Sequence, residues 1–222
     1  MGSQSGCAGK FLGGLFVSDN YFDSMSQEHF DILKEIGNIG AGNAMTALSQ
    51  MLQCKVDMSV PKVNLLEFKE LGEAMGGEEQ IMAGIYLGVE GDITGSIMFL
   101  LEKSSAKYLV GRLMGMESSE EGFSEMDYSA LQEVGNIITA AYLNSLSSLT
   151  RLVIYPSVPD VTVDMAGAIL SVPAIEFGIL SDHILLIQTQ FFDEIAIDGY
   201  FILIPDLESY DKILAALGMG TV

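Results

Sequence analysis

The sequence predicts an internally duplicated α/β fold whose sheet is largely antiparallel. Two observations lead to this prediction: the chain repeats itself, and each copy places helical periodicity before strand-like segments that form a hairpin. Of the 222 residues, 49% are hydrophobic and only 18% are charged, a composition far from that of disordered chains. We therefore expect a compact globule, built either as one large domain or as two small, closely packed ones.

The repeat emerges when the sequence is shifted by 98 positions. Residues 31–39 then lie over residues 129–137, and Leu, Glu, Gly, Asn and Ile recur at matching places. The same shift, without a gap, carries Ser59-Val60-Pro61 onto Ser157-Val158-Pro159. Agreement over this distance indicates duplication.

The repeat defines the predicted domain organisation. We expect one domain at 25–222, made of two repeats at about 26–120 and 124–222. Residues 1–24 are rich in Gly and Ser and have no sustained period. We interpret this segment as an N-terminal extension, either native or left over from cloning.

Each repeat is predicted to begin with a helix. Apolar and small residues recur at steps of three, four or seven, which places them on one face of a helix. They are Phe30, Leu33, Gly37, Ala41, Ala44, Leu48 and Met51 in the first copy, and Tyr128, Leu131, Gly135, Tyr142, Leu146 and Leu149 in the second. Glu35 with Asn38, and Glu133 with Asn136, fall about a quarter-turn or more away, so each pair projects toward one edge. Close helix packing is the expected reason for Gly37 and Gly135.

Strands and a closing helix follow in each repeat. Pro61 and Pro159 have β-branched neighbours, which favours an edge strand or a strand start, where a missing N–H is tolerated. Segments rich in β-branched and aromatic residues predict two hairpins. These are 81–89 with 94–101 and 184–191 with 195–204, and the closing helices are expected at about 104–114 and 208–217.

Charge, hydropathy and cysteine usage exclude several classes of function. The formal net charge of −20 repels phosphate backbones and anionic lipids, so no nucleic-acid partner is expected. No run approaches the roughly 20 apolar residues that span a bilayer, so no membrane insertion is expected. Cys7 and Cys54 form no close pair, which predicts neither a disulfide framework nor a thiolate metal site and fits a reducing cytoplasm.

The duplicated Glu-x-x-Asn pattern is the strongest candidate for a functional site. A single exposed Glu and Asn would be commonplace on a solvated helix. Keeping Asn beside Gly in both copies, however, retains two residues that weaken a helix. A carboxylate and a carboxamide contain no good nucleophile. Asn can orient an attacking water for in-line phosphoryl transfer, and Glu can act as a weak base or pair with a Lys or a metal of the substrate.

Other motifs are weaker. Gly37-x-x-Gly40-x-Gly42 has the spacing of a phosphate-binding loop, but it lies inside a helical pattern and follows no strand. His29 and His183 have no ligand-spaced acidic or thiol neighbours, so no metal site is predicted.

The spacing Asp/Ser-x3-Glu-x2-Asn-x22-Pro resembles that of the CheC, CheX and FliY phosphatases of bacterial and archaeal chemotaxis. The pattern is complete in both copies, and the resemblance extends from about residue 27 to the C-terminus. It is met first by Asp31, Glu35, Asn38 and Pro61, and again by Ser129, Glu133, Asn136 and Pro159.

The resemblance implies a cytoplasmic enzyme that hydrolyses the aspartyl phosphate of the response regulator CheY. Glu35 and Glu133 would contact a lysine of the regulator, while Asn38 and Asn136 would direct the attacking water. The resemblance implies no cofactor of the chain's own, because the Mg²⁺ belongs to the regulator. It further implies a pseudo-twofold fold with both motif helices on the surface. Asp31 and Ser129 would support the site or the helix start.

The resemblance also suggests a second partner and an alternative function. CheC proteins bind the receptor deamidase CheD through a region that falls near Asp164 to Glu176 here, where Pro173 argues against a regular helix. CheX carries one motif and dimerises, so two motifs resemble CheC more closely. The alternative is a non-catalytic adaptor or a flagellar-switch-associated protein that binds CheY or CheD.

Overall fold

The computed structural model describes residues 25–58, 62–116, 122–177, 183–192 and 196–220. The same order of elements occurs twice, once in each sequence repeat. It consists of a helix, two strands, a second helix, two more strands and a closing helix. The first run is α2 (Gln27–Leu52), β1 (Asp57–Met58), β2 (Lys62–Glu67), α3 (Phe68–Ala74), β3 (Ile81–Gly91), β4 (Gly95–Glu102) and α4 (Lys103–Met114). The second is α5 (Glu125–Thr150), β5 (Ile154–Pro156), β6 (Asp160–Met165), α6 (Ala166–Phe177), β7 (His183–Phe192), β8 (Ala196–Pro205) and α7 (Leu207–Ala216).

The strands form one antiparallel sheet in which the two repeats exchange strands. Its order is β1-β7-β8-β4-β3-β5, with β2 also paired to β7 and β6 also paired to β3. The first two strands of each repeat therefore pair with the hairpin of the other repeat. At the centre β4 pairs with β8, where Phe99 lies opposite Phe201. The prediction of a largely antiparallel sheet with two hairpins is confirmed.

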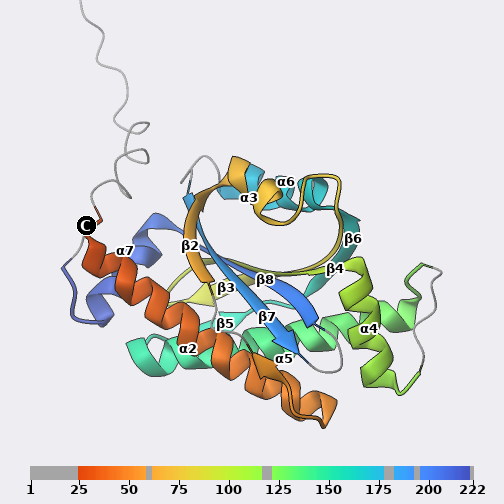
Figure 1. The fold of residues 1–222 in the computed structure, drawn as a ribbon. Helices are drawn as coiled ribbons and strands as arrows, with labels where there is room; N and C mark the ends of the chain where they lie inside the picture. The colour runs from red at the N-terminus through yellow and green to blue at the C-terminus, as the bar shows by residue number, and fades with distance from the viewer. Residues whose placement is uncertain (1–24, 59–61, 117–121, 178–182, 193–195, 221–222) are drawn as a thin grey trace, which may run out of the picture.

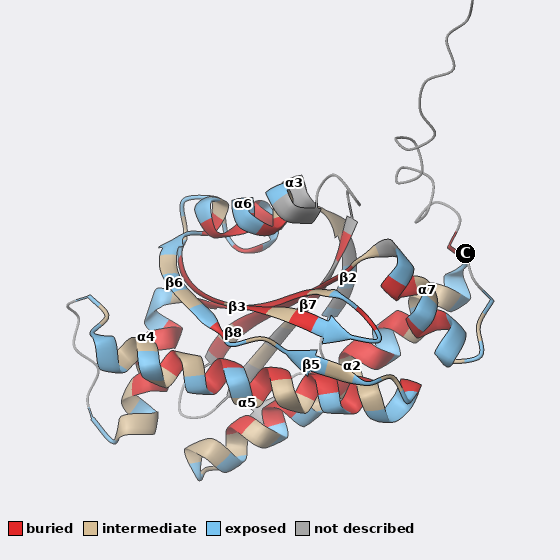
Figure 2. Ribbon diagram, turned by 180° about the vertical axis from the view of Figure 1, so that it is seen from behind, coloured by how far each residue is buried: buried red, intermediate tan, exposed pale blue. Residues whose placement is uncertain are grey.

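Helices cover both faces of this sheet. The long helices α2 and α5 lie side by side on one face, and the short helices α3 and α6 cover the other (Figure 1). The buried residues of α2 and α5 face the sheet (Figure 2). Each side of the sheet has its own apolar core. The predicted helical faces are largely confirmed, although Leu149 is 40% exposed.

Close approach between α2 and α5 depends on a glycine. A Cβ added to Gly40 would lie 2.3 Å from Cε2 of Tyr142, whose side chain is fully buried. Asn43 Nδ2 donates a hydrogen bond of 2.8 Å to Ser145 Oγ across the same contact. The two long helices therefore pack closely against each other.

Helix α6 corrects one prediction. Pro173 was expected to prevent a regular helix in this region, yet α6 continues through it from Ala166 to Phe177. Proline removes one backbone donor, but the surrounding packing offsets the loss: Pro173, Ile169 and Leu170 are all buried. Helix α3 occupies the equivalent place in the first repeat, where the sequence predicted no element.

Three other predictions fall on parts of the chain that the structure does not describe. Residues 1–24, Pro61 and the turn between the two strands of the second predicted hairpin, around residues 193–195, lie outside the described residues. Among the described helices, none is both long and apolar enough to cross a bilayer.

Two alanine substitutions in α2 test the close helix contact. Gly40→Ala is expected to destabilise the protein by about 1–3 kcal/mol, because the new methyl group meets the buried ring of Tyr142. Gly42→Ala is the matched control, since its Cβ would meet nothing within 4 Å. It is expected to stabilise the helix by about 0.5–1 kcal/mol. Urea denaturation measures both, and equal effects would contradict the packing argument.

Candidate functional site

The second Glu-x-x-Asn pair lies open to solvent on α5. Glu133 and Asn136 are both exposed, while Val134 and Gly135 between them are buried. At about 100° per residue, Glu133 and Asn136 lie about 60° apart around the helix, so their side chains share one outer face. One turn upstream, Ser129 is exposed and donates to the carbonyl of Glu125 at 3.0 Å.

The first pair occupies the equivalent face of α2 but is less open. Glu35 is exposed, whereas Asn38 is only partly exposed. The carboxamide oxygen of Asn38 is buried and has no hydrogen-bond partner among the described residues. An unpaired buried oxygen is unfavourable, so this side chain has a reason to change conformation or to take a new donor. Upstream, Asp31 accepts a hydrogen bond of 3.0 Å from Gln27 Nε2.

The proline of the second motif, Pro159, lies at the start of a strand. Pro159 is buried and directly precedes β6, as predicted for a strand start. Its carbonyl accepts a hydrogen bond of 3.4 Å from Nε2 of Gln132, the residue before Glu133. This bond attaches the β5–β6 loop to the motif helix. The corresponding Pro61 cannot be compared, because it lies outside the described residues.

Serine caps fix the starts of both motif helices. Ser26 and Ser124 are the N-caps of α2 and α5, and each forms a reciprocal capping box with the residue three positions on, His29 or Asp127. These caps were missed in the sequence, although the two serines are also 98 positions apart. Asp31 and Ser129 therefore lie inside the helices rather than at their starts. Their supporting role stays a prediction.

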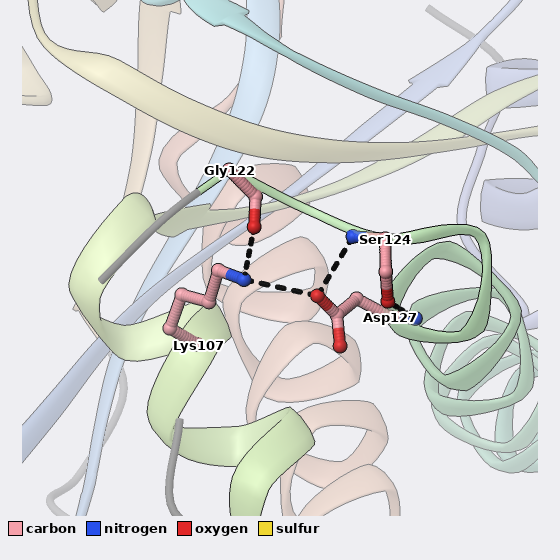
Figure 3. Close-up of polar contacts among 4 residues, drawn as sticks. All are labelled: Lys107, Gly122, Ser124 and Asp127. Atoms are coloured by element: carbon pink, nitrogen blue, oxygen red, sulfur yellow. Dashed lines mark hydrogen bonds and ion pairs between the residues drawn. The ribbon is translucent and has the colours of Figure 1, made fainter. Parts of the chain in front are cut away.

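A buried lysine further anchors the start of α5. Lys107 of α4 donates to the carbonyl of Gly122 at 2.5 Å and to Oδ2 of Asp127 at 2.9 Å (Figure 3). Its Nζ also lies 4.4 Å from the ring centroid of Phe123. The backbone N–H of Ser124 and the charge of Lys107 lower the pKa of Asp127, although partial burial opposes them. In the first repeat His29 stands in the place of Asp127, so α2 has no such ion pair at this capping position.

The two candidate sites lie on different parts of the helical layer. Helices α2 and α5 run in opposite directions along the sheet (Figure 1). Each motif falls in the first half of its own helix, while Gly40 and Tyr142 mark where the helices meet. The structure therefore presents two separate Glu/Asn pairs. Each offers one carboxylate to pair with a cation and one carboxamide to orient a water.

Comparisons with known proteins agree with these features. A family model described as the CheC-like family matches residues 20–65 and 126–163, which include both motifs. The chain is 38% identical over 203 residues to the CheY-P phosphatase CheC of Bacillus subtilis, covering 89% of this chain and 97% of that protein. It is 28% identical to the flagellar motor switch phosphatase FliY of Bacillus subtilis, covering 57% of this chain and 33% of that protein. Its fold is similar to the crystal structure of Thermotoga maritima FliY, with a TM-score of 0.70 at 21% identity, covering 88% of this chain and 98% of that one.

Asp127→Asn tests the anchor at the start of α5. Asparagine keeps an oxygen for the N–H of Ser124 but loses the charge that faces Lys107, so we expect a loss of about 1 kcal/mol at pH 7. Because the pKa of Asp127 is lowered in the folded protein, its contribution is complete above the unfolded pKa and is lost as the pH falls through the folded pKa. The stability difference between wild type and variant, measured by urea denaturation, should therefore shrink at acid pH. A constant difference from pH 7 to pH 3 would contradict this role.

Proposed function

Because this chain belongs to the CheC-like family, we propose that it hydrolyses the aspartyl phosphate of a CheY-type response regulator at two sites. The main support is that the structure carries a Glu/Asn pair on the outer face of each long helix. A folded receiver domain can reach such a face, whereas it cannot enter a narrow cleft. The relative that is 38% identical over most of the chain is itself a CheY-P phosphatase.

The proposed mechanism uses the chain for positioning rather than for covalent chemistry. Asn38 or Asn136 accepts a hydrogen bond from a water with its carboxamide oxygen and so orients the water oxygen toward phosphorus. Attack breaks the bond between phosphorus and the aspartyl oxygen, which returns the aspartate carboxylate and releases inorganic phosphate. Glu35 or Glu133 pairs with a lysine of the regulator and holds the two proteins in register. The Mg²⁺ near the phosphate would be bound by the regulator's own residues.

We propose that the second site is the faster of the two. Asn136 is exposed, so its carboxamide is free to meet a water. The oxygen of Asn38 is buried, and that side chain must turn before its oxygen can accept from a water at the surface. A rotation of this kind reduces the population of the competent state and therefore the rate.

Alanine substitution of the two asparagines tests the phosphatase function. Decay of a phosphorylated CheY-type receiver is measured with wild type, Asn38→Ala, Asn136→Ala and the double variant. We expect Asn136→Ala to slow the reaction more than Asn38→Ala. The double variant should lose roughly 100-fold, because correct placement of the water is the main catalytic contribution.

Matched controls separate chemistry from folding in this experiment. Asn144→Ala changes an exposed asparagine on α5 two turns beyond the motif and is expected to keep full activity. If wild-type protein fails to accelerate decay of a cognate receiver, the phosphatase proposal is wrong. If the double variant keeps wild-type activity, catalysis does not depend on these asparagines.

Helix α6 supports a second proposed role, as an adaptor for a CheD-type deamidase in the cytoplasm. This helix leaves Val172 46% exposed and Ile175 74% exposed, and Met165 just before it is 45% exposed. Apolar side chains gathered on one short segment are typical of a protein interface. The segment coincides with the region that the family resemblance assigns to the deamidase. It also lies on the face of the sheet opposite the two motif helices (Figure 1).

Charged substitutions on α6 test the adaptor role. The double variant Val172→Asp with Ile175→Asp should abolish binding of the organism's own CheD-type protein, measured by calorimetry. Phosphatase activity without the deamidase should stay within twofold of wild type, since the motif helices lie on the other face. Val153→Asp, at an exposed valine outside α6, is the control for added charge. Unchanged binding by the double variant would exclude α6 as the docking site.

A further inference from the structure

The β5–β6 loop exposes an apolar side chain beside the second site. Val158 is 85% exposed, more than any other large hydrophobic residue among those the structure describes. It lies between Pro156 and Pro159, in the short segment that joins β5 to β6. Isolated surface hydrophobics need no explanation. The position of Val158 and the rigidity of its loop are what distinguish it.

Hydrogen bonds hold this loop in one conformation. The backbone N–H of Ser157 donates to the carbonyl of Gly88 at 2.8 Å, and the N–H of Gly88 donates to Oγ of Ser157 at 2.8 Å. Gln132 Nε2 donates to the carbonyl of Pro159, as described above. The two prolines add fixed φ angles on either side. Val158 is therefore presented to solvent by a segment that is tied to both β3 and α5.

The bond from Gln132 places this loop next to Asn136. Gln132 and Asn136 are one turn apart, which is about 6 Å along the axis and about 40° around it. Glu133 and Asn136 point outward, and Gln132 lies on the flank of the helix between that face and the buried side. The loop therefore borders the outer face of α5 at the height of the motif.

We propose that Val158 is an anchor for the phosphorylated receiver domain at the Glu133/Asn136 site, inserting into an apolar hollow beside the phosphorylated aspartate. This inference rests on the proposed phosphatase function. A specific interface covers about 800 Å² on each partner, and a roughly circular patch of that area extends about 16 Å from its centre. A receiver centred on Asn136 would thus cover the adjoining loop. Burying a valine in a prearranged position gains affinity without the cost of ordering the loop.

The proposed anchor belongs to the second site alone. In the first repeat Lys34 occupies the position of Gln132, and Val60 lies outside the described residues. Lysine can also donate a hydrogen bond, but it carries a positive charge where Gln132 is neutral. The two sites are therefore expected to bind the receiver with different strength. The anchor must be tested where only the second site is active.

The test uses the full chain with Asn38→Ala, so that only the second site works. Val158→Ser in this background is expected to raise KM for the phosphorylated receiver about tenfold and to leave kcat within twofold. Val158→Ile should restore a KM near that of the parent. Val153→Ser is the matched control, because Val153 is also an exposed valine, with 49% of its surface accessible. It follows the C-terminal end of α5, about 20 Å along the helix from Asn136. The KM of the Val153→Ser variant should equal that of the parent.

Equilibrium binding separates this inference from the proposed function. The probe is the receiver domain with beryllofluoride and Mg²⁺, a stable mimic of an aspartyl phosphate. One outcome is that the parent protein accelerates decay and Val158→Ser has the same KM and Kd as the parent. In that case the proposal that Val158 is an anchor is wrong, and the phosphatase function stands. If neither the wild type nor the Asn38→Ala parent accelerates decay, the phosphatase function is wrong, and the Kd alone decides whether Val158 is an anchor. A tenfold weaker Kd for Val158→Ser supports it, and an unchanged Kd overturns it.

Discussion

The exchange of strands between the two repeats is the constraint on which the rest of the structure depends. Strands β5 and β6 of the second repeat complete the sheet beside β3 of the first, and β1 and β2 of the first pair with β7 of the second. Neither repeat can build its part of the sheet alone. The motif helices are held in the same way: Tyr142 of α5 packs on Phe201 at 4.5 Å between ring centroids and also meets Gly40 of α2. Each repeat therefore depends on the other for its part of the sheet and for the packing of its motif helix.

A single chain with two copies of a site can let them diverge, whereas a symmetric dimer cannot. The Glu/Asn pair is identical in both copies, but its supports are not. In the second copy Asp127 is paired with Lys107, and Gln132 holds the β5–β6 loop. In the first, His29 and Lys34 occupy these positions. Duplication therefore keeps the Glu/Asn pair in both copies, while the residues that support each pair differ.

Local patterns in the sequence predicted much of this fold and the position of each motif. Helical periodicity identified the buried faces of α2 and α5, and runs of β-branched residues located both hairpins. The strand exchange carries no local signal, because β6 would look the same whichever β-hairpin it joined. Pro173 misled the prediction for α6, since tertiary packing outweighed one lost backbone hydrogen bond. The difference between Asn38 and Asn136 is equally invisible in sequence, because it depends on contacts around each side chain rather than on the motif itself.

The glycine inside the second motif, Gly135, has a physical role that links the fold to the proposed chemistry. A Cβ on Gly135 would lie 2.3 Å from Cγ2 of Ile85, so α5 approaches β3 more closely than any larger residue permits. Asn136 is the next residue, about 100° further around the helix. The distance between α5 and the sheet at Gly135 therefore also sets the distance of the Asn136 carboxamide from the sheet. Positioning a water requires accuracy of about 1 Å or better. Because Ile85 belongs to the first repeat, the strand exchange and the helix packing together fix the height of the second site.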